Sequence, residues 1–310
     1  MIEEALRRGW SVSYLGSEEY FYEISTPQGK RCVYRGSMPQ SGSWVGNYIS
    51  RHKLLTSEYL RDHGFKVVPF LAFTSEASAE EFLQAYHPIV VKPEDSEKSQ
   101  GVTVDIETMA QLQDAVEKAK QYSSQVILQQ QLKGKLYRML AIGGIFCVAT
   151  HRRAAFVTGD GIRTIRELIV EKNTNPLRTE DGRPLTKIST ETAGQYIGPE
   201  RLDSIPDEGQ DIILSAIDSI SLGGEAANVT EGIHQDYITF TETVAQDLGL
   251  PSCGLDMMIP DITKPLDPGS AMPLLEVNSM PGFKMHYYPT AGGEPYNAAA
   301  RLLDATLGEA

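Results

Sequence analysis

The sequence predicts a globular protein of mixed α and β structure, and three observations support that prediction. The chain has 310 residues, of which 41% are apolar and 22% charged, enough for about two domains with sizeable cores. In some segments apolar and polar residues alternate, as they do in strands. Between these lie segments whose apolar residues recur every three or four positions, as in amphipathic helices. One such series, over residues 66–132, predicts a compact β-α-β unit. Disordered and fibrous classes are therefore excluded.

The elements follow from these patterns in chain order. A small amino-terminal α/β unit is expected to contain a helix at 2–8 and strands around 11–15, 20–25 and 31–34. A helix over 53–63 is expected to end at Gly64, because glycine suits the left-handed position after a helix. The β-α-β unit then predicts strands at 67–70, 88–93, 102–106 and 126–130, with helices at 76–86 and about 109–119.

The remaining half of the chain predicts a hairpin, a polar excursion and two late strands. Gly143 and Gly144 separate the two strands of the hairpin. The polar stretch Asn173–Arg201 is typical of a long surface loop. The expected elements are hairpin strands at 137–142 and 145–149, helices from Thr164 and near 212–220 and 236–248, strands at 252–259 and 273–278, and a last helix ending at 307.

Charge and cysteine content restrict the partners and the compartment. The chain carries 28 Lys and Arg against 41 Asp and Glu, a formal charge of −13, which argues against a nucleic-acid ligand. The apolar stretch Met139–Thr150 is too short for a membrane span, and the first residues are acidic where a signal peptide is basic. Cys32, Cys147 and Cys253 are isolated, as reduced core thiols are. We expect a cytoplasmic protein with no nucleic-acid or membrane partner.

Two late strands carry acids that suggest a metal site. Glu276 and Asn278 are two residues apart in a strand and share a face, and an adjacent antiparallel strand can place Asp256 beside them. Three oxygen ligands of this kind suit Mg²⁺. The alternative is a solvated outer face, although acids within otherwise apolar strands need a partner.

Lysines and small residues suggest a phosphate site. Lys92 ends a buried strand, and the loop after it holds Ser99 and Gly101, whose backbone can approach phosphate. Lys53 opens a helix, a place that favours anions over cations. The alternative for Lys92 is a surface lysine that buries only its stem. Neither a G-x-G-x-x-G nor a P-loop pattern is present.

Scattered bases form a third set. Arg138 and Arg152 lie in or before strands, and Lys284 and His286 lie in the last loop. Such bases either are solvated or bind carboxylate and phosphate groups. No nucleophilic triad or G-x-S-x-G elbow is apparent.

Taken in order, these motifs resemble the ATP-grasp superfamily of carboxylate–amine ligases, and most closely the ATP-grasp module of cyanophycin synthetases and bifunctional glutathione synthetases. The matching text covers about residues 50–305 and includes V-V-K-P, S-Q-G-V, Q-Q-Q-L-K-G-K-L-Y-R, V-T-G-D-G-I-R-T-I-R-E-L-I, G-G-E-A-A-N-V-T, C-G-L-D and L-L-E-V-N-S-M-P-G-F-K-M-H. The resemblance implies an α+β ATP-grasp fold in which two α+β subdomains grip ATP. The implied domains are a small amino-terminal α/β subdomain (1–52), a central lid (53–134) and a carboxy-terminal subdomain with the metal site (135–310).

The resemblance also implies the roles of individual residues. Asp256, Glu276 and Asn278 would bind two Mg²⁺ ions, for which Mn²⁺ can substitute. The implied catalytic residues, which would steady the transferred phosphate and the acyl substrate by their positive charge, are Arg138, Arg152 and Lys284. The implied substrate-binding residues are Arg152, Lys284 and His286. The implied ATP-binding residues are Lys53, Lys92, Ser99, Gly101, Gln130, Gln131 and Leu132.

The implied chemistry is amide formation. A substrate carboxylate attacks the γ-phosphate of ATP, and an amine then displaces phosphate from the acylphosphate. Since the 310 residues include neither the large amino-terminal region nor the Mur-ligase-like module of cyanophycin synthetases, we expect small amino-acid or peptide substrates. Ser96 and Ser99 replace lid glycines of the family, which keeps open a nucleotide-binding relative without turnover. A kinase of small acids and a homodimer also remain open.

Overall fold

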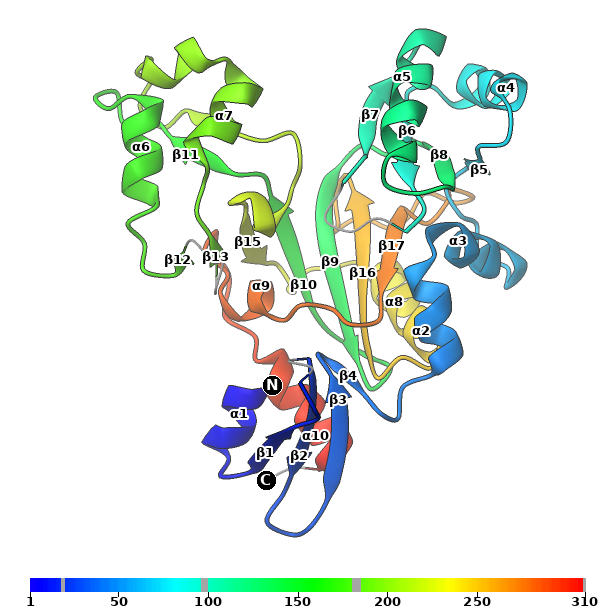
Figure 1. Ribbon diagram of the computed structural model, residues 1–310, viewed down its shortest axis with the longest axis vertical. Coiled ribbons are helices and arrows are strands. Elements are labelled where there is room, and N and C mark those ends of the chain that lie inside the picture. Colours follow the sequence, from blue (N-terminus) through cyan, green and yellow to red (C-terminus); the bar gives the residue numbers. More distant parts are fainter. Residues whose placement is uncertain (18–19, 96–99, 180–184, 309–310) are drawn as a thin grey trace. The chain divides into compact units, whose positions relative to one another are not determined.

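The computed structural model of the protein describes residues 1–17, 20–95, 100–179 and 185–308. The chain divides into two compact units, each described below by itself. The first unit comprises Met1–Ala149, Thr230–Phe283 and Asn297–Ala310, and the second comprises Thr150–Val229 and Lys284–Tyr296. Figure 1 shows the elements of both units. None of the described helices is long and apolar enough to cross a membrane.

The amino-terminal residues form a four-stranded antiparallel sheet against which the last helix packs (Figure 1). The Tyr34 hydroxyl on this sheet lies 2.5 Å from the Thr306 hydroxyl of that helix. Arg8 pairs with both Glu4 and Asp304, and so joins the two ends of the chain. The predicted helix and strands are confirmed. The elements are α1 (Ile2–Arg7), β1 (Ser11–Tyr14), β2 (Phe21–Ser25), β3 (Arg31–Arg35), β4 (Met38–Pro39) and α10 (Ala298–Leu307).

Two helices lead from this sheet to the rest of the first unit. Helix α3 (Lys53–Asp62) confirms the predicted helix, and Gly64 adopts a φ of 86° after it. Helix α2 (Trp44–Arg51) was not predicted, although the Ser43 side chain caps it by accepting from the Gly46 N–H.

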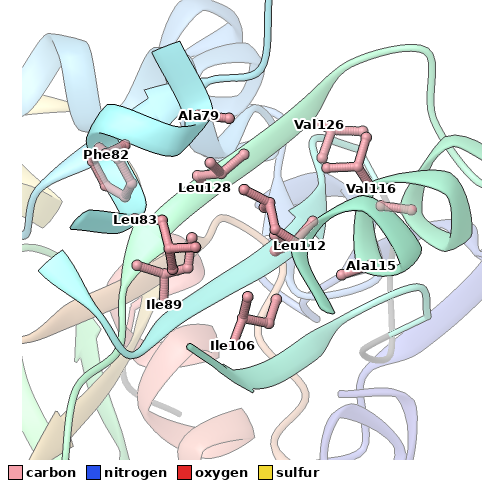
Figure 2. Packing of buried hydrophobic residues seen from close by; sticks show 12 residues of the cluster. Ala79, Phe82, Leu83, Ile89, Ile106, Leu112, Ala115, Val116, Val126 and Leu128 are labelled. Atoms are coloured by element: carbon pink, nitrogen blue, oxygen red, sulfur yellow. The ribbon is translucent and has the colours of Figure 1, made fainter. Parts of the chain in front are cut away.

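The compact unit predicted over residues 66–132 is present with its helices and strands. Its four strands pair antiparallel, however, and not in the parallel arrangement of a β-α-β unit. Figure 2 shows its core, in which Leu83, Leu112 and Leu128 from both helices and a central strand meet. The first strand begins at Phe70 and not at Val67, since Pro69 has no N–H to donate to a ladder. The elements are β5 (Phe70–Ala72), α4 (Glu76–Tyr86), β6 (Ile89–Pro93), β7 (Thr103–Ile106), α5 (Met109–Lys120) and β8 (Val126–Gln130), in the sheet order β5-β8-β6-β7.

A second large sheet carries the late strands. The predicted hairpin is confirmed, and Gly143 and Gly144 form its turn with positive φ angles of 63° and 75°. Strand β16 pairs antiparallel with β9 on one side and with β17 on the other. Helix α8 packs against β9 and β16. The elements are β9 (Lys135–Ile142), β10 (Ile145–Arg153), α8 (Gln235–Asp247), β16 (Ser252–Ile259) and β17 (Leu274–Asn278).

The second unit has its own apolar core, which includes Ile169, Ile188 and Leu202. It contains the last residues of β10, which pair with β15. Its other elements are β11 (Phe156–Thr158), α6 (Ile165–Lys172), β12 (Arg178–Thr179), β13 (Leu185–Thr186), α7 (Thr190–Ile197), η1 (Pro199–Asp203), β14 (Asp211–Ile213), η2 (Ile220–Leu222), β15 (Glu225–Asn228) and α9 (Lys284–Tyr287).

Two predictions in this unit are wrong. The helix expected near 212–220 is instead strand β14, which pairs with β11, followed by irregular chain and the short η2. Ile212 is buried between two exposed neighbours, which is a strand pattern. The stretch 173–201 is not merely a surface loop, because it contains helix α7 and contributes buried Ile188 and Ala193 to the core.

Candidate active site

Three neighbouring strands place the predicted charged residues in one row. Asp256 on β16 is the direct register partner of Arg138 on β9 and of Glu276 on β17. Register partners on one face of an antiparallel sheet have adjacent side chains. The structure thus brings together two of the predicted metal ligands, Asp256 and Glu276, and one predicted catalytic residue, Arg138.

Arg138 and Asp256 form a buried ion pair with side-chain exposures of 6% and 5%. Arg138 Nε donates to Asp256 Oδ1, and Arg138 Nη2 donates to Asp256 Oδ2 at 3.0 Å. The pair is therefore bidentate, the geometry in which a guanidinium recognises a carboxylate best.

Glu276 lies on the other side of Asp256 and completes the acidic pair. Burial, followed by the negative charge of Asp256, raises the pKa of Glu276. Asn278, the third predicted ligand, donates its amide to Glu276 Oε1 at 3.2 Å. Among the described residues no group of three His, Cys, Asp or Glu side chains gathers as a metal site.

Lys92 reaches this row from the smaller sheet. It is the last residue but one of strand β6 and is 8% exposed. Its Nζ donates to Gln129 Oε1 at 2.7 Å and to the Leu275 carbonyl at 3.5 Å. Burial, followed by the positive charge of Lys53, lowers the pKa of Lys92 to about 8. The lysine is thus a buried cation beside the strand that carries Glu276, and not a surface lysine.

Glu94 is a buried acid at this site that the sequence analysis did not single out. Lys53 Nζ donates to the Glu94 backbone carbonyl at 3.0 Å, and the Leu54 N–H donates to the Glu94 carboxylate. The start of helix α3 carried the signal that could have indicated this acid. His52 makes no side-chain cap there, and Lys53 opens the helix, so an acceptor and a negative charge have to come from elsewhere in the chain. The anion expected near Lys53 is therefore provided, in this structure, by the chain itself.

The predicted adenine segment lies at the end of strand β8. Gln130 is the last residue of β8, and Gln131 and Leu132 come directly after the strand. The Gln131 side chain is engaged with Asp105, since its Oε1 accepts from the Asp105 N–H and its Nε2 donates to Asp105 Oδ1, both at 2.7 Å.

The predicted phosphate loop is described only in part. Ser99 lies outside the described residues. Gly101 has a φ of 72°, and a Cβ there would lie 2.7 Å from atoms of both Pro93 and Tyr122. Only glycine fits that position.

The remaining predicted residues belong to the second unit. Arg152 lies in β10 and is the register partner of Ala226 in β15. Lys284 is exposed at the start of α9, whereas His286 is fully buried and its Nδ1 lies 2.6 Å from the Thr150 hydroxyl. Of these two residues only Lys284 is accessible to a ligand, whereas the buried His286 side chain contacts Thr150 in the interior of the unit.

The comparisons with known proteins agree with this architecture. Residues 59–146 match the family described as D-ala D-ala ligase C-terminus. The glutathione biosynthesis bifunctional protein GshAB of Mannheimia succiniciproducens is 30% identical over 299 residues, which make up 93% of this chain and 40% of that protein. Cyanophycin synthetase of Geminocystis herdmanii is 37% identical over 225 residues, or 70% of this chain and 25% of that protein.

Solved structures show the same fold. The crystal structure of a bifunctional glutathione synthetase from Pasteurella multocida matches with a TM-score of 0.76 at 25% identity, covering 98% of this chain and 43% of that one. D-alanine–D-alanine ligase from Bacillus anthracis matches with a TM-score of 0.52 at 16% identity, covering 86% of this chain and 69% of that one.

The predicted α+β ATP-grasp fold is confirmed, and the chain shares this fold with ATP-grasp ligases. Within that class its sequence relatives are bifunctional glutathione synthetases and cyanophycin synthetases, as the motifs predicted. The chain spans 40% of the length of the first of these relatives and 25% of the second.

Proposed function

We propose that the protein is an ATP- and Mg²⁺-dependent ligase that joins the carboxylate of one amino acid or short peptide to the amine of another. The observation that supports this most directly is the row of Arg138, Asp256 and Glu276 on three adjacent strands, with buried Lys92 beside it. An acidic pair flanked by two buried cations suits a site for polyphosphate with a divalent metal.

The residues present fit a divalent cation. Asp256 and Glu276 are adjacent carboxylates whose mutual repulsion raises the pKa of Glu276 after burial does, and a cation between them would relieve that repulsion. The Asn278 amide oxygen is the third hard donor, while its amide N–H binds Glu276. We assign two Mg²⁺ ions, replaceable by Mn²⁺, to these three residues. When bound, the metal would neutralise charge on the phosphate oxygens.

The phosphates of ATP are assigned to the lysines. Lys53 lies close to Lys92, since its positive charge contributes, after burial, to lowering the pKa of Lys92 to about 8. Ser99 and Gly101 flank the phosphates in this proposal. Adenine is assigned to the segment Gln130–Leu132, where Gln131 and Leu132 would contribute their backbone. The proposed domains stay as 1–52, 53–134 and 135–310.

The chemical steps need positioning and charge neutralisation but no protein nucleophile. An oxygen of the substrate carboxylate bonds to the γ-phosphorus while the bond to ADP breaks, and the amine nitrogen then displaces inorganic phosphate from the acyl carbon. Arg138, held by Asp256, would face the transferred phosphate. Arg152 and Lys284 would bind the substrate carboxylate as cations that donate hydrogen bonds to it, and His286 would support them from the interior.

A substrate matrix tests this function. The full chain is incubated with ATP, Mg²⁺ and pairs of amino acids, peptides and small acids, and ADP, phosphate and product mass are measured. Glu276→Gln should lower turnover more than about 100-fold, since partners outside the metal shell alone account for about 10- to 100-fold. Asp114→Asn on the exposed face of α5 makes the same carboxylate-to-amide change and should leave turnover intact.

The outcomes separate the competing functions. An amide product with equal amounts of ADP and phosphate supports the ligase. A phosphorylated acid that accumulates without any amine identifies a kinase. Tight ATP binding without ADP across the whole matrix identifies a nucleotide-binding relative without turnover, and either of the last two results contradicts the proposal. Sedimentation of the same sample tests whether the protein is a homodimer.

A further inference from the structure

Within the second unit, Asn228 of strand β15 makes several hydrogen bonds to the segment Lys284–Tyr296. The Asn228 amide donates to the carbonyls of His286 and Glu294, both at 2.7 Å. Its backbone N–H donates to the Gly292 carbonyl at 2.9 Å, so one asparagine binds three carbonyl groups of this segment. In Figure 1, α9 of this segment lies beside β15.

The approach of the segment to β15 is close. A Cβ on Gly293 would lie 2.0 Å from the Asn228 carbonyl oxygen, so no other residue fits at that position. The Ala291 N–H donates to the Ala226 carbonyl at 2.8 Å. The segment therefore runs against β15 by backbone as well as by side-chain bonds.

These bonds fix the direction of every proton in the group around Asn228. Its amide nitrogen must face two carbonyls, because carbonyl oxygens only accept, so its Oδ1 faces the Thr150 hydroxyl at 2.6 Å. Thr150 must donate its single hydroxyl proton to that oxygen. The contact of 2.6 Å between Thr150 Oγ1 and His286 Nδ1 therefore requires His286 to donate, and its ring carries hydrogen on Nδ1.

The anchor also fixes how Lys284 is presented. His286 is fully buried, and residues two apart in a helix point about 200° apart around its axis. The buried His286 thus turns Lys284, at the start of α9, toward solvent, where it is exposed. The position of this cation depends on Asn228 and Thr150, neither of which needs to touch a ligand.

We propose that Asn228, acting with Thr150 through His286, is a positioning residue that holds Lys284 in place to bind the carboxylate of the amino-acid or peptide substrate. This rests on the proposed function. The hydrogen bonds of this anchor lie within the second unit, whereas Arg138, Asp256 and Glu276 belong to the first. We therefore expect loss of the anchor to weaken binding of the carboxylate substrate more than binding of ATP.

Asn228→Asp is the decisive variant because it has almost the same shape but no N–H to donate. It removes both bonds to the carbonyls of His286 and Glu294 and replaces them with repulsion between oxygens. Asn175→Asp is the matched control, because it adds the same charge in the same unit. Among the described contacts the Asn175 side chain uses only its Oδ1, which accepts from the Leu177 N–H and is kept in aspartate. Thr150→Val removes the hydroxyl, and Thr150→Ser restores it.

Two measurements on the full chain test the proposal. In Asn228→Asp and Thr150→Val, hydrogen exchange of the backbone amides in residues 286–296 should quicken at least about tenfold. The KM for the carboxylate substrate should rise at least about tenfold, with the KM for ATP changed less than about twofold. Asn175→Asp and Thr150→Ser should match the wild type in both.

Each outcome decides. Unchanged exchange in Asn228→Asp overturns the anchor. Faster exchange with both KM values raised equally, or neither raised, overturns the positioning of the substrate and leaves a structural anchor. Wild-type protein without turnover contradicts the proposed function, and the proposed role toward the substrate falls with it, whereas the exchange measurement still confirms or overturns the anchor.

Discussion

The carboxylate of Glu94 caps helix α3 from a distant part of the chain. Its two oxygens accept from the Leu54 N–H at 3.2 and 2.9 Å, across 40 residues of sequence. His52 provides no side-chain cap, so Glu94 supplies both the missing acceptor and a negative charge for the helix dipole. Because the same residue accepts from Lys53 through its carbonyl, it places the helix and the lysine together.

Glu94 predicts a specific dependence of stability on pH. Burial raises the pKa of Glu94 above its ordinary value of 4.5, and the bonds from Leu54 oppose the shift without cancelling it. A carboxyl whose folded pKa is raised contributes stability that is complete below its unfolded pKa and is lost as pH rises through the folded pKa. The variant Glu94→Gln keeps an acceptor oxygen but has no carboxyl group to ionise. Its free energy of unfolding, relative to that of the wild type, should therefore increase from pH 4.5 to pH 7.5.

Urea unfolding at four pH values across that range measures the difference. Glu81→Gln on α4 removes the same charge at an exposed position and serves as the control. A difference between Glu94→Gln and the wild type that shrinks as pH rises would show that the folded state favours the ionised carboxyl, contrary to the prediction.

The ion pair of Arg138 and Asp256 predicts a large loss of stability when one partner is removed. Asp256→Asn leaves the Arg138 guanidinium buried without its counter-charge, which costs about 3–5 kcal/mol. Relief of the repulsion from Glu276 places the expected value near the lower end of that range. Asp62→Asn breaks the exposed pair with Arg61 and should cost less than about 1 kcal/mol. Chemical denaturation at pH 7 gives both values, and equal losses would refute the prediction.

The sequence predicted the acids of this site but not their pairing with Arg138. Glu276 and Asn278 lie in one short strand, and acids in apolar strands must find partners, so the local pattern was enough. Arg138 is 118 residues from Asp256, and no local pattern specifies the register between strands so far apart. Glu94 was missed for a related reason, because its partner is a backbone N–H that carries no sequence signal.

Local patterns also explain the errors in the second unit. The segment from Asp211 to Ile220 has the apolar spacing of a short helix, but pairing with β11 stabilises its first residues as a strand. Helix α7 contains Gly194 and three threonine or isoleucine residues, all weak helix formers, so tertiary packing against Leu202 stabilises it.

Gln131 predicts a separation of stability from nucleotide binding. Its Oε1 satisfies the N–H of Asp105, a non-glycine residue with a φ of 58° next to an irregularity in the pairing of β6 with β7. Gln131→Ala should lower the free energy of unfolding by about 0.5–1.5 kcal/mol. Since the side chain is engaged with Asp105, ATP affinity should change less than about threefold, as a contribution through backbone predicts. Calorimetric titration with ATP and Mg²⁺ measures the affinity, and a loss above about tenfold would show direct contact of the side chain with ATP.

Gly254 predicts that one methyl group can disturb the site through Arg138. The residue lies two positions before Asp256 in β16, and a Cβ there would lie 2.9 Å from Pro281 Cβ and 3.0 Å from Arg138 Cδ. Gly254→Ala should cost about 1–3 kcal/mol of stability by overpacking. It should also slow turnover about 10- to 100-fold, since displacement of a catalytic group by about 1 Å has effects of that size.

Gly282→Ala is the control for the added methyl group, because among the described residues no atom beyond Gly282 and its two chain neighbours lies within 4 Å of its Cβ position. Its free energy of unfolding should stay within about 0.5 kcal/mol of the wild-type value. Unfolding and turnover of both variants separate two causes. If Gly254→Ala is destabilised as expected but turns over at the wild-type rate under conditions where it is fully folded, the position of Arg138 does not limit the reaction, and its proposed role at the transferred phosphate is wrong.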